Sequence, residues 1–374
     1  MDPVTHVAAG VLISQVMPGP SRGWSALAGA AFALLPDIDY FMIFADRLAF
    51  IRHHRGFTHS LAALFLFALL GAALGRALGG PRWFRPMLFL GLAVLASHLL
   101  LDLATSYGTQ ILFPFSRQRF TLDWLFIIDP YLTGLLLFGA IAALASAIWG
   151  RTAGSYFLAA VGAYVLLCGF YHQQALTLAR QVFPETPLLG RPPGSLIRRQ
   201  TVTLPWQVFP TDSGATTVAA LPQPFSCRRW QLVAANCEEV QQSFVLLPYL
   251  AWLESRSTAP PATRLPVHAG CRVPNGGYQR PREMQVQVWT GLPAPNLIGP
   301  PEAQKILDQY LEFARFPLLR RLEPRSDGEL LEWLDLRFSV PGRDFPFVLQ
   351  LQLDAAGRVQ HWSLGRCQDG EAKS

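Results

Sequence analysis

The residues best able to do chemistry in this sequence are histidines and aspartates that interrupt apolar segments. His98 and Asp102 stand four residues apart in the run LAVLASHLLLDLATSYG. On a helix this spacing places both side chains on one face, one turn apart. Ionisable groups inside an apolar helix are costly and usually mark a functional site. The spacing suits two ligands of one metal ion; the alternative is a pair satisfied by hydrogen bonding alone.

A second pair of acids follows a proline in LLPDIDYF. Asp37 and Asp39 end an apolar segment, where the partial negative charge of a helix C-terminus disfavours carboxylates. Two neighbouring carboxylates also repel each other unless protons or a cation neutralise them. A solvated helix terminus is the alternative interpretation. A bound cation would remove both conflicts.

The segment HHRGFTHS, residues 53–60, supplies imidazoles, a fixed positive charge and a glycine for a sharp turn. We interpret His59 as a metal ligand because it stands where the next apolar segment begins. His53 is interpreted as a surface histidine. The candidates for catalysis are Asp39, His54 and Arg55.

Apolar segments must position these groups, and six of them precede Arg180. They span approximately residues 4–17, 24–36, 60–79, 86–104, 124–149 and 155–179. Only the last two or three reach the roughly 20 residues that cross a bilayer unaided. The first two are short, so we expect them to be tilted, covered by their neighbours, or joined as a hairpin.

If these helices alternate in direction, all the candidate groups fall at one end of the bundle. They are His6, Asp37, Asp39, His54, His59, His98, Asp102 and Asp129. The turns at the other end carry arginines and no acid. Taken singly, His6 could be an ordinary helix-start residue and Asp129 a helix cap. Their convergence with the other six predicts a shared site.

Histidine and aspartate without cysteine suit zinc, manganese or iron. The expected metal ligands are His6, Asp37, Asp39, His59, His98, Asp102 and Asp129. This set exceeds the four ligands of one tetrahedral zinc ion, so one or two divalent ions are expected. Arg55, Arg117 and Arg119 could hold a phosphate, or could simply extend to the membrane interface.

The composition indicates a membrane protein with a second, soluble part. Of 374 residues, 51% are hydrophobic and only 15% charged, which is too apolar for an ordinary soluble protein. The net charge of +6 comes from scattered arginines rather than a basic stripe, so nucleic-acid binding is not expected. We predict an α-helical membrane bundle of about six helices over 1–182, a linker over 183–198, and a soluble α+β, mostly β, domain over 199–374.

Alternating polar and apolar residues predict strands in that second part. The expected strands are Thr201–Val208, Thr216–Leu221, Trp230–Ala234, Ser243–Leu247, Met284–Trp289, Leu331–Phe338 and Phe347–Leu353. LDAAGRVQHW predicts a hairpin, and 301–315 an amphipathic helix. The cysteines of this part could form two disulfides in an oxidising compartment or remain thiols; they are Cys227, Cys237, Cys271 and Cys367.

The arginine-only turns favour a cytoplasmic location for the end opposite the site. The site and the C-terminal domain would then face the periplasm. The site end also carries arginines, among them Arg47 and Arg52, which weakens the charge asymmetry on which this orientation depends.

The ordered motifs DPVTHVAAG, LLPDIDYF, HRGFTHS and SHLLLDLATSYGTQILFPF, with a later DP, resemble those of the YdjM-like (LexA-regulated) inner-membrane metal-dependent hydrolases. The resemblance covers about residues 1–130 closely. It implies a bacterial inner-membrane protein with metal-dependent hydrolase activity and no defined substrate. By motif position it implies a site made of His6, Asp37, Asp39, His54, His59, His98 and Asp102. Asp129 is our addition to that set.

The function expected from these features is a membrane-embedded hydrolase of a phosphoester or ester, acting on a lipid or another phosphorylated substrate at the bilayer. The alternative is a transporter or channel for metal ions or small solutes, because such paths are also lined by His and Asp. A transporter should place its ligands near the bilayer midplane, with polar residues continuing to the other face. A non-catalytic membrane anchor is the third possibility, against which the intact ligand set argues.

Overall fold

The computed structural model describes residues 1–44, 46–183, 201–203, 217–235, 239–249, 262–265, 271–290 and 301–366. The chain forms two compact units. The helical unit comprises Met1–Ala45, His53–Phe170 and Thr201–Gln207, and the sheet unit comprises Asp46–Arg52, Tyr171–Gln200 and Val208–Ser374. Apart from residue 183, the predicted linker 183–198 lies outside the described residues.

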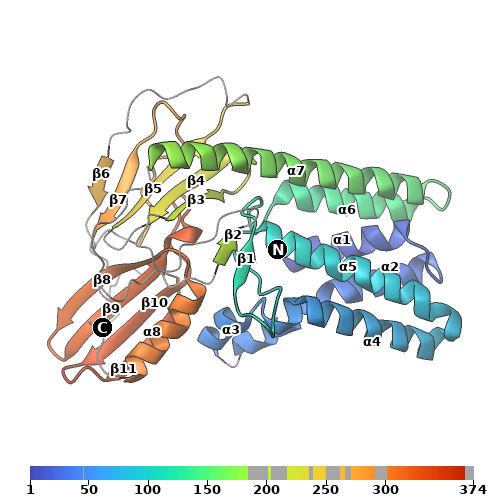
Figure 1. Cartoon of the computed structure of the whole chain (residues 1–374), viewed down its shortest axis with the longest axis horizontal. Coiled ribbons are helices and arrows are strands. Elements are labelled where there is room, and N and C mark those ends of the chain that lie inside the picture. Colours follow the sequence, from blue (N-terminus) through green and yellow to red (C-terminus); the bar gives the residue numbers. More distant parts are fainter. Residues whose placement is uncertain are drawn as a thin grey trace. The chain divides into compact units, whose positions relative to one another are not determined.

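The first half of the chain is helical, as predicted (Figure 1). Its elements are α1 (Pro3–Val16), α2 (Arg22–Leu34), the 3-10 helix η1 (Pro36–Phe44), α3 (Arg47–His53), the 3-10 helix η2 (Phe57–His59), α4 (Leu61–Gly79), the 3-10 helix η3 (Pro81–Trp83), α5 (Phe84–Ala104), β1 (Arg119–Thr121), α6 (Pro130–Ala145) and α7 (Gly150–Val182). The short β2 (Thr201–Thr203) pairs in parallel with β1.

Three stretches of the described chain are long and apolar enough to cross a membrane: Leu61–Gly79, Pro81–Ala104 and Gly150–Val182. A fourth span would be α2 and η1 together, which meet at a bend of 51°. Helices α1 and α6 are shorter apolar helices. The first two apolar segments were expected to be too short to cross alone, and their helices α1 and α2 have only 14 and 13 residues.

Small residues bring the helices of this unit close together. Helix α1 packs against α2, α5 and α6, and α4 packs against α5. A Cβ atom at Gly10 would clash with the carbonyl oxygen of Gly29, so the backbones of α1 and α2 touch at these glycines. Between α2, α4 and α5 lies a buried apolar cluster that includes Phe32, Ala68 and Leu95. Close backbone approach at small residues is typical of helices packed in lipid.

The predicted fold class is confirmed, and strands occur in most of the stretches predicted for this part (Figure 1). Two stretches differ: 201–203 form β2, which belongs to the helical unit, and 336–338, predicted as the end of a strand, form a 3-10 helix. One sheet has the order β3-β4-β5-β7-β6, made of Thr217–Pro222, Arg229–Ala235, Glu239–Leu246, Val286–Thr290 and Ala262–Leu265. The other has the order β11-β10-β9-β8, made of Val359–Gly365, Val348–Asp354, Gly328–Asp335 and Pro317–Arg325. Helix α8 (Pro301–Phe313) precedes β8, and the 3-10 helix η6 (Leu336–Phe338) follows β9. Residues 204–208, the end of the first predicted strand, lie outside the described residues.

Two cores hold this unit together. The sheets share one that includes Val233, Trp289 and Leu334. The other joins the five-stranded sheet to the last turns of α7, where Ala175 packs in a cluster with Trp230. The sheet unit thus takes in the end of the longest apolar helix.

The structure decides for two of the four cysteines of this part whether they form a disulfide. Cys271 is disulfide-bonded, and Cys227 takes no part in a disulfide. The other two cysteines, Cys237 and Cys367, lie outside the described residues.

Candidate metal centre

The centre is built first on the last turns of α5. His98 and Asp102 lie one turn apart, as the sequence spacing predicts, and each is 1% exposed. His98 Nδ1 lies 2.8 Å from the carbonyl oxygen of Ala33. Its Nε2 lies 3.3 Å from Asp102 Oδ2. The Ala33 contact fixes Nδ1 as the protonated nitrogen, so Nε2 is the one that can bind a metal.

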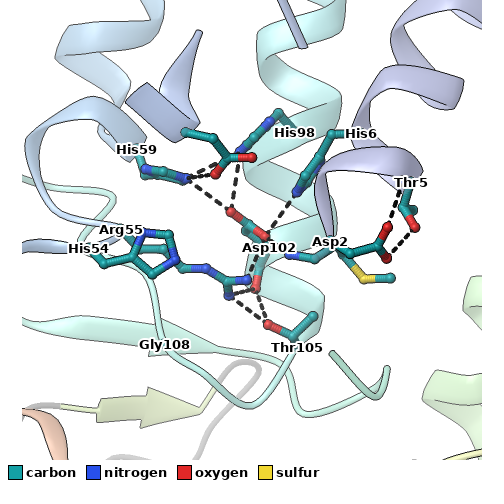
Figure 2. A network of polar contacts seen from close by, with 12 residues as sticks. Asp2, Thr5, His6, His54, Arg55, His59, His98, Asp102, Thr105 and Gly108 are labelled. Carbon is teal, nitrogen blue, oxygen red and sulfur yellow. Dashed lines mark hydrogen bonds and ion pairs between the residues drawn. The ribbon is translucent and has the colours of Figure 1, made fainter. Parts of the chain in front are cut away.

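His59, at the end of η2, directs its Nε2 to the same point. This nitrogen lies 3.2 Å from His98 Nε2, 3.3 Å from Asp102 Oδ2 and 3.4 Å from Asp37 Oδ1. Figure 2 shows the His59 imidazole approaching His98 and Asp102, which both project from α5. Two ring nitrogens and two carboxylates therefore face one another without intervening protein.

His6 completes the donor set from α1. Its ring stacks on that of His98, with ring centroids 3.6 Å apart. Its Nε2 lies 3.3 Å from Asp102 Oδ1, which the amino group of Met1 also contacts. Neither ring nitrogen of His6 has a hydrogen-bond partner in the structure, and the same holds for Asp37 Oδ2 and Asp102 Oδ2. Four buried polar atoms thus lack the hydrogen bonds that buried polar atoms normally make.

These residues fit a divalent cation. Two groups, His6–Asp37–His98 and His59–His98–Asp102, each offer one ligand atom per residue within 4.8 Å of the others. Ligands bound to one tetrahedral zinc at about 2.1 Å would stand about 3.4 Å apart. The separations at His59 Nε2, 3.2 to 3.4 Å, are of this size. A cation would also neutralise the charge of the facing carboxylates and give the unpartnered atoms a ligand interaction.

Asp39 lies behind the donor set rather than in it. Its Oδ1 lies 2.9 Å from His54 Nδ1, and its Oδ2 accepts hydrogen bonds from the Arg55 backbone N–H and the Thr58 hydroxyl. The same Oδ2 lies 3.4 Å from His59 Nδ1. Asp39 belongs to neither of the two groups. It instead contacts the nitrogen of His59 that faces away from them, as carboxylates that orient metal-binding histidines do.

The buried arginines are bound to the protein itself. Arg55 Nη2 lies 2.8 Å from Asp102 Oδ1, and Arg55 Nη1 donates to the Thr105 hydroxyl at 2.7 Å. Arg119 Nη1 donates to the carbonyl oxygens of His54 and Gly108, two residues labelled in Figure 2. Nη atoms of both arginines thus already contact protein groups. That Arg55 and Arg119 hold a phosphate stays a prediction. Arg117 is exposed.

His54 and His59, the histidines around the centre that lie outside the apolar helices, have opposite charge states at neutral pH. Burial acts to lower the pKa of His59, but the adjacent carboxylates of Asp102, Asp37 and Asp39 outweigh it and raise the pKa to about 10. Burial lowers the pKa of His54 to about 4, although Asp39 opposes that shift. Without a metal, His59 is therefore protonated at pH 7 and His54 is neutral.

Asp129 has the role that was the alternative for it. It is the N-cap of α6, and its Oδ1 accepts hydrogen bonds from the N–H groups of Tyr131 and Leu132. Its Oδ2 accepts a hydrogen bond from the Tyr164 hydroxyl at 2.8 Å. It lies in neither of the two possible ligand groups. The structure thus shows Asp129 as a helix cap, and its assignment as a ligand stays a prediction.

Two contributors to the site carried no signal in the sequence. Tyr107 packs its ring edge-on against His54 and lies under the guanidinium of Arg55, 4.7 Å from the ring centroid. The carbonyl of Ala33 orients His98. A backbone acceptor on another helix leaves no mark in composition or spacing. Tyr107, in the SYG that follows α5, resembled any other aromatic residue at a helix end.

Comparison with known proteins places this site within the matched region. The model of the family described as YdjM inner membrane protein matches residues 1–176. Inner membrane protein YbcI of Escherichia coli (strain K12) is 37% identical over 134 residues, which cover 32% of this chain and 72% of YbcI. The protein YfhP of Bacillus subtilis (strain 168) is 27% identical over 179 residues, 46% of this chain and 53% of YfhP. The match thus spans only about half of YfhP. No solved structure matches the chain.

Proposed function

The chain belongs to the YdjM inner membrane protein family, and from this premise we propose that it is a membrane-embedded, metal-dependent hydrolase of a phosphoester or ester. One observation carries the proposal. Buried imidazoles and carboxylates from α1, η1, η2 and α5 face a single point, and four of their polar atoms lack a hydrogen bond.

The donor set supports one ion rather than two. Both possible groups use His98, and Ala33 already occupies the Nδ1 of this histidine. One remaining nitrogen lone pair serves one ion. The residues that would hold it are His6, Asp37, His59, His98 and Asp102. Their chemistry favours zinc, with manganese and iron as the other candidates.

When bound, a divalent ion would lower the pKa of a coordinated water towards neutrality and polarise a phosphoryl or carbonyl oxygen. The chain's own residues prepare that chemistry. Arg55 holds Asp102 in place through its guanidinium. Asp39 orients His59 and binds His54 Nδ1, so that His54, neutral at pH 7, could accept a proton at its other nitrogen.

The surroundings of η1 favour a lipid substrate. This short helix buries Asp37 and Asp39, while Ile38, Phe41 and Phe44 are 52%, 72% and 85% exposed. Its carboxylates are the most exposed acids of the centre, at 9% and 7%. Apolar chains could therefore lie against the outer face of η1 while a polar head group approaches from the same side.

The interior of the helical unit disfavours the transporter alternative. Beyond the centre, the space between α2, α4 and α5 is filled by apolar side chains, among them Phe32, Leu64 and Leu90. A conducting path would need polar groups to continue across the membrane.

The membrane side of the site belongs to the proposal as well. The protein is an inner membrane protein with apolar helices, and we place the site and the C-terminal region on the periplasmic side. The disulfide at Cys271 supports an oxidising compartment for that region. Thiol labelling of intact cells after mild reduction tests this placement: labelling by a membrane-impermeant reagent is expected, and its absence contradicts it.

The test of the function itself uses the full chain purified in detergent. Zinc content is measured for the wild type and for the Asp37→Ala, His98→Ala double variant, followed by turnover of phospholipid and ester substrates. We expect about one zinc per chain in the wild type, none in the variant, and turnover only where zinc is bound. Equal zinc in both proteins contradicts the ligand assignment. Bound zinc without any turnover contradicts the hydrolase.

A further inference from the structure

Helix α4 fixes the level at which its first residue meets the membrane. It is one of the apolar helices long enough to cross, with 19 residues from Leu61 to Gly79. At about 1.5 Å per residue it covers the hydrocarbon core of a bilayer, roughly 30 Å thick, with no length to spare. When α4 spans the membrane, Leu61 therefore lies at the boundary between lipid tails and head groups.

The segment between α5 and β1 forms a turn, residues 111–116, that is tied to this boundary. The Leu61 N–H donates a hydrogen bond to the Ile111 carbonyl oxygen at 3.0 Å. A second backbone hydrogen bond, from the Ser116 N–H to the Leu112 carbonyl oxygen at 3.1 Å, closes the segment on itself. The turn is thus held beside the first residue of α4, within the helical unit.

The exposed side chains of this turn are apolar, and a cation follows them. Phe115 is 93% exposed and Leu112 is 41% exposed. Phe113 packs edge-on against Phe57 of η2, with ring centroids 6.1 Å apart, and Phe57 is itself 45% exposed. Arg117, next to the turn, is exposed as well. Apolar side chains beside a basic residue are typical of segments that lie in the bilayer interface.

The lipid-facing side of α4 continues into this turn. Leu61, Phe65 and Leu69 are spaced four residues apart, so they share one side of the helix. They are 46%, 63% and 51% exposed, and the exposed side of a spanning helix faces the lipid tails. Phe57 precedes Leu61 at the same spacing. An exposed apolar patch that extends such a surface has the membrane as its partner.

We propose that the turn 111–116 inserts into the interface of the bilayer, with Leu112 and Phe115 among the upper parts of the lipid tails and Arg117 at the level of the lipid phosphates. The partner is the bilayer itself, through apolar contact and through the phosphate that phospholipid head groups carry. Because His59 precedes Leu61 by two residues, the inserted turn also keeps the metal centre near the level of the head groups. The inference depends on membrane insertion alone and stands whether or not the centre hydrolyses a substrate.

The experiment measures the depth of the turn by fluorine magnetic resonance. Trifluoromethyl-phenylalanine replaces Phe115 in the full-length protein, reconstituted in vesicles of phosphatidylethanolamine and phosphatidylglycerol. Separate samples contain lipid with a nitroxide near the head group, lipid with a nitroxide at the end of the acyl chain, or a water-soluble gadolinium chelate. The same label at Leu69 of α4 reports the lipid tails, and at the exposed Gln118 it reports water.

We expect the signal at position 115 to be broadened most by the nitroxide near the head group and least by the chelate. Broadening by the chelate alone, as expected at position 118, would place the turn in water and overturn the inference. A signal unchanged in all three samples would mean that protein covers the patch, either the sheet unit or a second copy, and would overturn it equally. So would broadening chiefly by the nitroxide at the end of the acyl chain, as expected at position 69.

Two substitutions in the labelled protein test the arginine. Arg117→Glu should weaken the broadening at position 115 by the nitroxide near the head group, because the lipid phosphates repel a carboxylate. Arg117→Lys keeps a cation and should leave the broadening unchanged. The label at position 69 should give the same result in both variants, which shows that α4 is still inserted. Equal broadening at position 115 in the two variants would overturn the assignment of Arg117 to the phosphates.

Discussion

His98 Nδ1 lies 2.8 Å from the carbonyl oxygen of Ala33, so α2 determines which nitrogen of this α5 histidine faces the metal centre. The contact spans two helices that also pack against each other through Phe32 and Leu95. The acceptor is a backbone carbonyl, so it does not titrate, and a side-chain substitution at Ala33 does not remove it. The Nε2 atom of His98 therefore faces the other donors.

The first prediction follows from the presence of His98 in both possible ligand groups. His98→Ala should lower zinc affinity by more than about a hundredfold, since it removes a ligand rather than a residue that orients one. His6→Ala should have the smaller effect, because His59, His98 and Asp102 remain as a group. Zinc per chain, measured by plasma mass spectrometry after dialysis, distinguishes the two. Equal retention by both variants would contradict this ranking.

The second prediction concerns Asp39, which contacts His54 and His59 without belonging to either ligand group. Asp39→Asn should bind zinc about ten- to a hundredfold more weakly while keeping the same stoichiometry. Asp37→Asn, at a ligand position, should lose more. Chelator competition gives both affinities. An Asp39 variant as weak as the Asp37 variant would make Asp39 a ligand.

The third prediction is a pH dependence of metal binding. The pKa of His59 is raised to about 10, above the ordinary value of about 6.5, so a proton must leave before a metal can bind its Nε2. Zinc affinity should increase about tenfold per pH unit for this one proton, from pH 6.5 upwards to the limit set by zinc hydroxide. Proton release on zinc addition, measured in two buffers by calorimetry, checks the sign. Affinity independent of pH would mean that His59 is not the ligand.

The same shift fixes how the stability of the metal-free protein responds to pH. A folded-state pKa above the unfolded one stabilises the protein fully below the unfolded value, and this contribution disappears as pH rises towards 10. His59→Gln should flatten that alkaline loss.

The fourth prediction separates the cap role of Asp129 from metal binding. Asp129→Ala removes the acceptor for the Tyr131 and Leu132 N–H groups and should lower the free energy of unfolding by about 1 kcal/mol. Asp129→Asn keeps an acceptor there and should cost less. Both variants should hold wild-type zinc. Loss of zinc from the Asn variant would restore Asp129 to the ligand set.

The fifth prediction tests the contact of α1 and α2. Gly10→Ala places a methyl group against the Gly29 carbonyl, and separating the two backbones should cost about 1–3 kcal/mol. Gly134→Ala in α6 is the control, because a Cβ atom there meets nothing within 4 Å. Thermal unfolding in detergent should show a lower midpoint for the first variant and an unchanged or higher one for the second.

Much of this protein can be predicted from its residue order. The apolar runs 60–79, 86–104 and 155–179 correspond to helices long enough to cross a bilayer, since the rise per residue is fixed. The run 124–149 was expected to be as long, but its helix α6 has only 16 residues. The spacing of His98 and Asp102 places them on one helical face for the same reason. In the sheet unit, alternation predicted β4 and β10 but not β8, whose PLLRRLEPR ends in charged residues and buries Arg320 against Glu332. A charged residue that is buried in one strand by an ion pair to the next breaks the pattern on which such predictions depend.

What the residue order determined by itself is that imidazoles and carboxylates meet at one end of a helical bundle, because alternating helices return their ends to the same place. Which of them face one another was decided only by the tertiary structure. Asp37 and Asp39 are two residues apart, yet one joins the donor set and the other stands behind His59. Asp129 lies at a helix start like other candidates, yet caps α6. These outcomes depend on distances of a few ångströms between segments far apart in the chain, and no local pattern encodes such distances.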